Sequence, residues 1–490
     1  MDCMTLLDTA RAKGIEVDVV DGQLCVTGDR QHETLVRQLL DQKEDIIPLL
    51  EPPVEGEDTA LTAYTALPIG GNDPWPDAMD DAALYGLIGD IVNTIEPHTE
   101  ADPVAVLVQS LIAFGNVIGR SAHFRAEADL HYGNMFCCLV GETSKGRKGT
   151  SWGHTARLLE PIDPDWQRNI QSGLSSGEGL IWAVRDPVSK PQPQYEGKGR
   201  NKSVVSYEDV IVDQGVDDKR LLVLESEFSS VLKVAGRERN TVSAIIRQAW
   251  DSGSLQTLTK NSPARATDAH ISIIGHITRD ELRRLITETD LANGLANRFL
   301  WLCVRRSKCL PEGGSLRPDD LSPHVQRLRA AVEFASSTGE LRRDSATRDV
   351  WRGVYPTLSQ GKPGLLGAAT SRSEAQTMRL AMLYALLDRS QVIREEHLLA
   401  GLAVWTYADQ SARYIFGSAL GDPVADAILR ELRRVHPDSL TRNDIREHFR
   451  RNKSAEEISR ALGVLFECHL VRCERVETGG RPAEIWFARI

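Results

Sequence analysis

The sequence predicts an α/β fold, in which a mostly parallel sheet is flanked by helices. Three short apolar runs support this: FCCLV at 136–140, LLVL at 221–224 and HISIIGHI at 270–277. Continuous apolar runs of this length are typical of strands that are buried on both faces. Helical periodicity separates and follows the runs, and a glycine-rich turn comes directly after the first of them.

That turn has the composition of a phosphate-binding loop between a strand and a helix predicted at 150–160. Backbone N–H groups and a helix N-terminus surround phosphate oxygens in such loops. The usual motif places Lys directly after the second Gly, so Lys148 stands one residue late. Thr150 and Ser151 are both candidates for the hydroxyl that would ligate Mg²⁺. The candidate phosphate-binding residues are Gly141, Glu142, Thr143, Ser144, Lys145, Gly146, Arg147, Lys148, Gly149, Thr150 and Ser151.

Two later apolar segments end in polar residues. If both segments are strands of a parallel sheet, these residues lie at its carboxyl edge, near the predicted phosphate-binding loop. The run at 221–228 ends in Glu225 and Glu227, and a carboxylate there would hold magnesium or orient the attacking water. We assign Glu225 to the metal and Glu227 to water, although the reverse is open, as is a plain core strand with solvated acids. His276 and Thr278 at the end of the third run are candidate sensors of a terminal phosphate, with a structural histidine as the alternative.

Arg298 lies between a Gly/Asn turn and the apolar segment 299–303. A permanently charged guanidinium there could complete a neighbouring subunit's site, because it would neutralise charge on a transferred phosphoryl group. The alternative is an arginine that forms a salt bridge at the strand edge.

Composition limits the possible partners. With 58 Lys and Arg against 69 Asp and Glu, the net charge is −11, so nucleic-acid binding would need a local basic surface. The eight cysteines show neither zinc-ligand spacing nor a disulfide framework, and no apolar run is long enough for a membrane span. We therefore expect a reduced cytoplasmic protein without a membrane partner.

Three further parts are predicted around this core. Residues 1–52 form a small α+β module with an Asp21–Gly22 hairpin and a net charge of −6, which favours a protein partner; residues 53–76 form a linker. Within 77–420, helices at 77–120 precede the first strand, a polar insertion near 190–202 is expected to be irregular, and 315–420 form a helical lid.

Residues 422–490 read as three helices and a hairpin, which is the layout of a winged helix-turn-helix. Such domains bind DNA or act as protein-interaction modules. A basic cluster on and beside the second and third helices and in the wing makes up the candidate DNA-binding surface: Arg442, Arg446, Arg450, Arg451, Lys453, Arg460 and Arg481.

The segments LVGETSKGRKGTSW, LLVLESEF, HISIIGHIT and ANGLANRFLW together resemble a family of RecA-type P-loop ATPases of bacterial mobile elements, a domain of unknown function described as YfjI-type or primase-helicase-like. The resemblance spans roughly residues 80–420, and residues 1–52 resemble a TubC-type docking domain. The resemblance of residues 80–420 implies a RecA-like core that uses ATP and Mg²⁺ and forms oligomers such as hexameric rings. It also implies that the protein acts as a helicase or translocase on single-stranded DNA or replication forks.

Three alternatives remain open at this point. They are an ATP-dependent regulator that binds DNA through the tail, a defence ATPase that recruits a partner through the N-terminal module, and a scaffold whose phosphate loop has lost its activity.

Overall fold

The structure is a computed structural model that describes residues 16–20, 23–27, 74–142, 146–196, 203–237, 239–258, 264–286, 293–362, 364–417, 422–468, 470–476 and 483–489. The chain divides into two compact units, Met1–Thr65 and Ala66–Ile490. In the first, β1 (Glu16–Val20) pairs antiparallel with β2 (Gln23–Thr27), as the hairpin prediction expects. The helices predicted for that module, and the predicted linker up to residue 73, lie outside the described residues.

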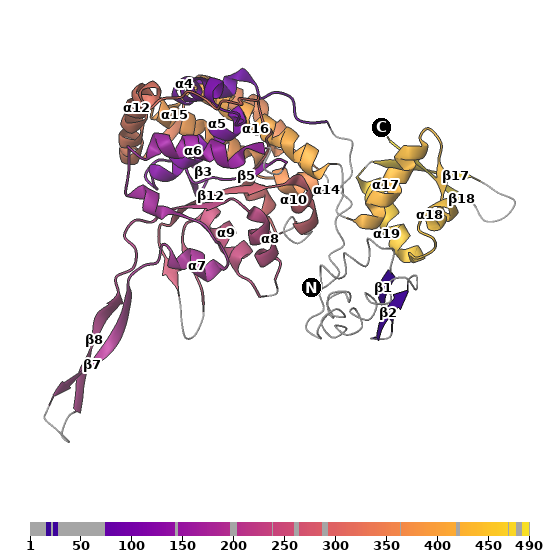
Figure 1. The fold of residues 1–490 in the computed structure, drawn as a ribbon, viewed down its shortest axis with the longest axis horizontal. Helices are drawn as coiled ribbons and strands as arrows, with labels where there is room; N and C mark the ends of the chain where they lie inside the picture. The colour runs from indigo at the N-terminus through magenta and orange to yellow at the C-terminus, as the bar shows by residue number, and fades with distance from the viewer. Residues whose placement is uncertain are drawn as a thin grey trace. The chain divides into compact units, whose positions relative to one another are not determined.

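A five-stranded parallel sheet forms the centre of the second unit and confirms the α/β prediction (Figure 1). Its order is β13-β5-β12-β9-β6, so the first strand of the sheet along the chain lies between the fifth and the fourth. The bounds are β5 Phe136–Val140, β6 Ile170–Gln171, β9 Arg220–Glu225, β12 His270–Ile277 and β13 Phe299–Cys303. All residues of β5, β12 and β13 are buried, which explains why β5 and β13 appear in the sequence as uninterrupted apolar runs; β12 also buries the polar residues His270, Ser272 and His276.

Helices cover both faces of this sheet (Figure 1). Successive side chains of a strand point to opposite faces, and β5 shows the result: Cys137 and Leu139 join one apolar cluster, whereas Phe136, Cys138 and Val140 join another. The first cluster includes α4 (Gly86–Ile95), α5 (Pro103–Val117), α6 (Lys148–Leu159), α12 (Pro318–Ser337) and α15 (Ser373–Leu387). The second includes α7 (Gly177–Trp182), α8 (Phe228–Ala235), α9 (Val242–Asp251), α10 (Arg279–Leu285) and α14 (Gly364–Thr370).

The predicted helical lid contains two short strands as well as helices. α13 (Ser345–Ser359) and α16 (Glu395–Phe416) complete its helices. A second sheet has the order β15-β14-β3-β4, with β3 at His123–Ala126, β4 at Asp129–Tyr132, β14 at Glu340–Arg343 and β15 at Val392–Ile393. Two small strands, β10 (Leu255–Gln256) and β11 (Arg265–Ala266), pair with each other.

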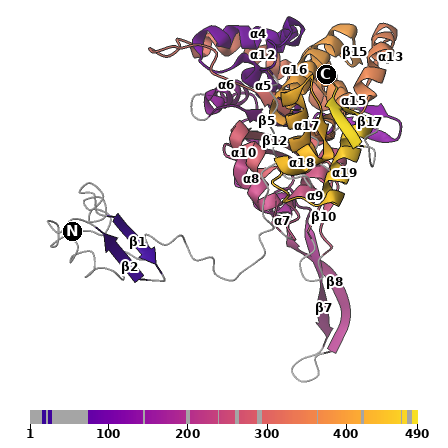
Figure 2. The ribbon, with the colours of Figure 1, turned by 90° about the vertical axis from the view of Figure 1, so that its right-hand side faces the viewer.

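The expectation of an irregular insertion near 190–202 was wrong for the part that is described. β7 (Val188–Glu196) and β8 (Ser203–Asp213) form an antiparallel hairpin that extends away from the sheet and its helices, as both ribbon views show (Figures 1 and 2). None of the described side chains of the hairpin is buried, and Tyr195 and Tyr207 are 51% and 68% exposed. Polar composition marked a segment outside the core, but a hairpin needs only backbone pairing and not burial.

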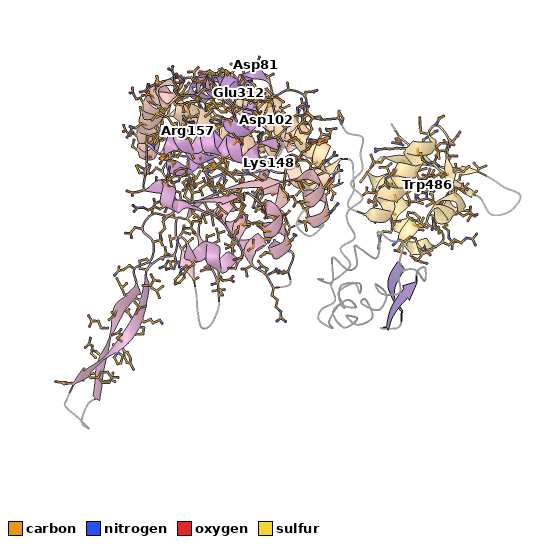
Figure 3. The ribbon with its side chains drawn as sticks, viewed as in Figure 1. Asp81, Asp102, Lys148, Arg157, Glu312 and Trp486 are labelled. Carbon is orange, nitrogen blue, oxygen red and sulfur yellow. The ribbon has the colours of Figure 1, made fainter. Side chains whose placement is uncertain are left out.

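The C-terminal segment has an apolar core made of its own residues, with Trp486 in it (Figure 3). The three predicted helices and two predicted strands are all present, and one extra short strand completes an antiparallel sheet of order β16-β18-β17. The elements are α17 Pro423–Val435, β16 Leu440–Thr441, α18 Arg442–His448, α19 Ala455–Glu467, β17 Val471–Val476 and β18 Ala483–Ala488. Among the described helices of the whole chain, none combines the length and apolarity that a membrane crossing requires.

Candidate functional site

The candidate site lies at the carboxyl edge of the parallel sheet. Val140 pairs with Ile277 on one side and with Cys303 on the other, so the residues after β5, β12 and β13 emerge together. The N–H of Gly141 donates to the carbonyl of Ile277 at 3.2 Å. A Cβ on Gly141 would lie 2.4 Å from the carbonyl oxygen of Val304, so only glycine allows this close approach of two backbones. Ligands of open α/β sheets bind at this edge.

Lys148, labelled in Figure 3, is the first residue of α6, and its side chain folds back onto the residues that follow β5. Its Nζ donates to the carbonyl oxygens of Gly141 at 3.1 Å and Glu142 at 2.8 Å. Burial lowers the pKa of this ammonium, while the charge of Glu281 opposes that shift. Thr143, Ser144 and Lys145 lie outside the described residues. The described ends of the loop therefore surround a half-buried cation at the start of a helix.

Arg147, the N-cap residue of α6, has an unusual backbone conformation directly before Lys148. The residue before the lysine is Gly in the usual motif, and Arg147 adopts the left-handed conformation that favours glycine, with φ 49° and ψ 25°. Arg147 therefore has the backbone conformation of a glycine at the position directly before the lysine. Gly146 is buried, but Arg147 separates it from the lysine.

The structure distinguishes the two candidate hydroxyls. Ser151 is fully buried; its Oγ accepts a hydrogen bond from Gln109 Nε2 at 2.6 Å and donates to the carbonyl of Lys148 at 2.7 Å. Thr150 is exposed in the first turn of α6, and a Cβ added to the neighbouring Gly149 would meet no atom within 4 Å. Thr150 is therefore the accessible hydroxyl of the two, whereas the hydroxyl of Ser151 is used in hydrogen bonds within the protein.

His276 belongs to a buried network beneath the loop. Its Nε2 lies 3.2 Å from Gln109 Oε1, and Gln109 Nε2 donates to Ser151 and to the carbonyl of Ala105. Since both amide hydrogens of Gln109 are used, its Oε1 accepts, and Nε2 of His276 carries the proton. Burial and then the charge of Lys148 lower the pKa of His276 to about 4, so the ring is neutral at pH 7.

Thr278 caps α10 and is not free to sense a ligand. Its Oγ1 donates to Glu281 Oε2 at 2.8 Å and accepts from the N–H of Glu281, which forms a capping box. The hydroxyl hydrogen bond is the largest cause that lowers the pKa of Glu281. Glu281 is thus an ionised group whose charge acts on Lys148.

The two predicted carboxylates have different surroundings. Glu225 ends β9 opposite Gly275 of β12; it is 5% exposed and accepts the N–H of Leu174 at 2.6 Å. Glu227 is exposed at the N-cap of α8, where its carboxylate makes no capping hydrogen bond. Both belong to the carboxyl edge of the sheet, one strand beyond β12. Over the part of the chain that the structure describes, no group of three or more His, Cys, Asp or Glu side chains could hold a metal ion.

Arg298 lies at the amino ends of the parallel strands, whereas the candidate site lies at their carboxyl ends. Arg298 ends a 3-10 turn (Ala296–Arg298) directly before β13, and β13 runs parallel to β5. It is 6% exposed, and its guanidinium donates to Asp251 Oδ2 at 2.5 Å and to the carbonyl of Gly294 at 2.6 Å. This geometry supports the salt-bridge alternative, because a buried and paired arginine cannot extend to a neighbouring subunit in this conformation.

Several members of the predicted DNA-binding surface have acidic partners within the tail. Arg442 pairs with Glu484 at 2.7 Å and Lys453 with Glu457 at 3.1 Å, and longer pairs join Arg451 to Glu447 and Arg460 to Asp422. Arg446 and Arg450 are exposed, and Arg481 lies outside the described residues. The described basic surface is therefore smaller than the sequence count suggested.

Sequence reasoning missed Gln109 and Glu281. Gln109 was visible as a polar residue inside the apolar helix predicted at 104–118, and such a residue needs a buried partner. Glu281 follows Thr278 by three residues, which is the spacing of a capping box.

No protein-family model matches the sequence, and no curated protein is significantly similar to it. The interpretation of the site therefore rests on its own geometry.

Proposed function

We propose that this chain is a P-loop ATPase that hydrolyses ATP with Mg²⁺ and acts as a helicase-like translocase on DNA in the replication of a mobile element. The observation that carries the proposal is Lys148, which begins α6 and folds its ammonium onto the carbonyls that follow β5. A lysine and free helix N–H groups at one point are what polyphosphate binding needs.

The strand order is consistent with the RecA-like core that the sequence resemblance implies. Numbered along the chain, the order is five-one-four-three-two, with the candidate loop after strand one and the two glutamates after strand three. In this arrangement a phosphate-binding group and an acidic group share one edge, with a single strand between them.

The chain's own groups define the roles at such a site. Lys148 and the N–H groups at the start of α6 would hold the phosphates, and Thr150 and Glu225 would hold magnesium. Bound MgATP supplies a phosphoryl group that is open to in-line attack by water. Glu227, with its exposed carboxylate, would orient that water. His276 is neutral, so it donates a hydrogen bond near the loop without adding charge.

The C-terminal segment supports a role on DNA. Its three helices and antiparallel strands have the composition and order of a winged helix, and Arg446 and Arg450 would contact the phosphate backbone. The acidic N-terminal module would dock a protein partner. A ring-shaped homo-oligomer would place several such sites around one DNA strand, but Arg298 does not supply the group that completes a neighbour's site in this conformation.

The first test is Lys148→Ala in the full-length protein. ATP turnover, measured as phosphate release with and without single-stranded DNA, should fall at least about a hundredfold, because the charge nearest the transferred group is lost. Lys190→Ala, which changes an exposed lysine on β7, is the matched control. Undiminished turnover in Lys148→Ala would refute the loop assignment.

A DNA-binding regulator is the second candidate, and the order of the C-terminal elements favours it, because winged helices bind duplex DNA through one helix and a hairpin. Strand separation driven by ATP would support the translocase. Sequence-specific duplex binding without strand separation would support the regulator.

A further inference from the structure

A cavity of about 520 Å³ opens beside the first turns of α6, and it begins where the candidate phosphate site ends. Arg147 and Thr150 belong to its lining as well as to the phosphate loop. Its volume lies within the range of small-molecule sites. We propose that this cavity binds the base and ribose of the nucleotide, an inference that rests on the proposed function.

One wall of the cavity is a face of α6. Thr150, His154 and Arg157 stand four and three residues apart, so they lie along one side of the helix. Figure 3 shows Arg157 at a distance from Lys148 along α6. A ligand whose phosphates are held at the start of α6 would extend along this face. The wall therefore runs in the direction in which the ribose and base would extend from bound phosphates.

The opposite wall comes from the segment after β13, and Glu100 fixes it in place. Glu100 accepts hydrogen bonds from Arg306 and from the N–H of Leu310 at 2.8 Å, and its other oxygen accepts from Arg147 Nε at 2.8 Å. The hydrogen bond from Arg306, above all, holds the pKa of Glu100 down to about 2. One carboxylate therefore connects the phosphate loop to the wall that would face the base.

The chemistry of the lining suits a nucleoside. Leu310, Pro311 and Leu316 supply apolar surface for a base, and the exposed guanidinium of Arg157 can stack on an aromatic ring. Three arginines against one glutamate leave the cavity positively charged, which favours a ligand that carries phosphates.

His154 and Thr99 lie side by side in the lining of the cavity. Nε2 of His154 lies 3.0 Å from Thr99 Oγ1, whereas Nδ1 is buried and has no hydrogen-bond partner. Burial and the charge of Arg157 lower the pKa of His154, so the ring is neutral at pH 7. His154 therefore adds surface to this wall of the cavity without adding positive charge.

The test compares two ligands on the full-length protein by isothermal titration: ATP and inorganic tripolyphosphate, which has the phosphates without the nucleoside. His154→Ala and Leu310→Trp, of which the second fills the cavity, should each weaken ATP binding about tenfold and leave tripolyphosphate binding unchanged. Arg157→Glu is a surface change that tests the same wall if either variant fails to fold. His448→Ala, in the tail, is the control, and Lys148→Ala should weaken both ligands.

The outcomes separate the two ideas. If the wild-type protein binds both ligands equally tightly, or if the cavity variants leave ATP affinity unchanged, the nucleoside assignment is overturned while the phosphate site stands. If the cavity variants weaken tripolyphosphate as much as ATP, the cavity holds phosphates and the assignment is again overturned. If the wild-type protein binds neither ligand, the proposed function fails and the inference falls with it.

Discussion

Replacement of His276 by glutamine should make the protein less sensitive to acid. The pKa of His276 is lowered from 6.5 to about 4 by burial and by Lys148, so the folded protein excludes a proton that the unfolded chain binds. Stability from this group is complete above pH 6.5 and is lost as the pH falls toward 4. Between pH 7.5 and pH 5.0 the loss is about 2 kcal/mol. His276→Gln keeps the hydrogen bond to Gln109 and removes the titrating ring.

Urea unfolding of the wild type and of His276→Gln, followed by circular dichroism at the two pH values, measures this effect. The variant should lose about 2 kcal/mol less than the wild type on acidification. Gln109→Leu is the matched control: it removes the partner of the ring at both pH values and keeps the titrating group, so its pH dependence should remain that of the wild type. An identical pH dependence in wild type and His276→Gln would refute the argument.

The remaining predictions concern the loop, Arg298 and the hairpin. Arg147→Val should bind ATP about tenfold more weakly than Arg147→Gly, because both variants lose the Glu100 pair and the charge but only valine resists a positive φ; equal affinities of the two variants in a fluorescent-ATP titration would show that the backbone conformation does not matter. Arg298→Ala should destabilise the fold by about 2 kcal/mol in chemical denaturation, since the hydrogen bonds of a buried guanidinium to Asp251 and Gly294 are lost while the half-exposed Asp251 keeps its pair with Arg372; unchanged stability with lost turnover would instead indicate that this arginine acts in a neighbour's site. Replacement of residues 190–211 by a short Gly/Ser linker should change the melting temperature by less than about 3 °C, because the side chains of the hairpin are exposed; a large drop would mean that the hairpin packs against the body.

The sequence predicted the strands of the sheet well where burial dictated composition. β5, β9, β12 and β13 are mostly apolar because helices cover both of their faces, and several polar residues in them, such as His276, are buried as well. β6 contains only Ile170 and Gln171, which is too short to show a period. The β7–β8 hairpin escaped prediction for the opposite reason: its strands are held by backbone hydrogen bonds, and exposed side chains leave no apolar pattern.

Within the candidate site, the sequence identified the lysine but not its surroundings. Lys148 could be found because strand, glycine-rich turn and helix follow one another in the chain. The choice between Thr150 and Ser151 could not, because it depends on Gln109, which reaches Ser151 from a helix more than forty residues earlier. The conformation of Arg147 is equally invisible, since arginine carries no general preference for a positive φ.

The two glutamates at the end of β9 show how a turn of the chain gives two similar residues different surroundings. Residues two apart on a strand face the same side, and Glu225 and Glu227 would be equivalent if β9 continued. The strand instead ends at Glu225, and α8 begins at Phe228. Glu225 is consequently buried, with one oxygen committed to the N–H of Leu174, whereas the carboxylate of Glu227 stays in solvent. A fixed carboxylate suits a metal ion that must be held in place, and an exposed one suits a water molecule that must exchange, which is the division of roles proposed above.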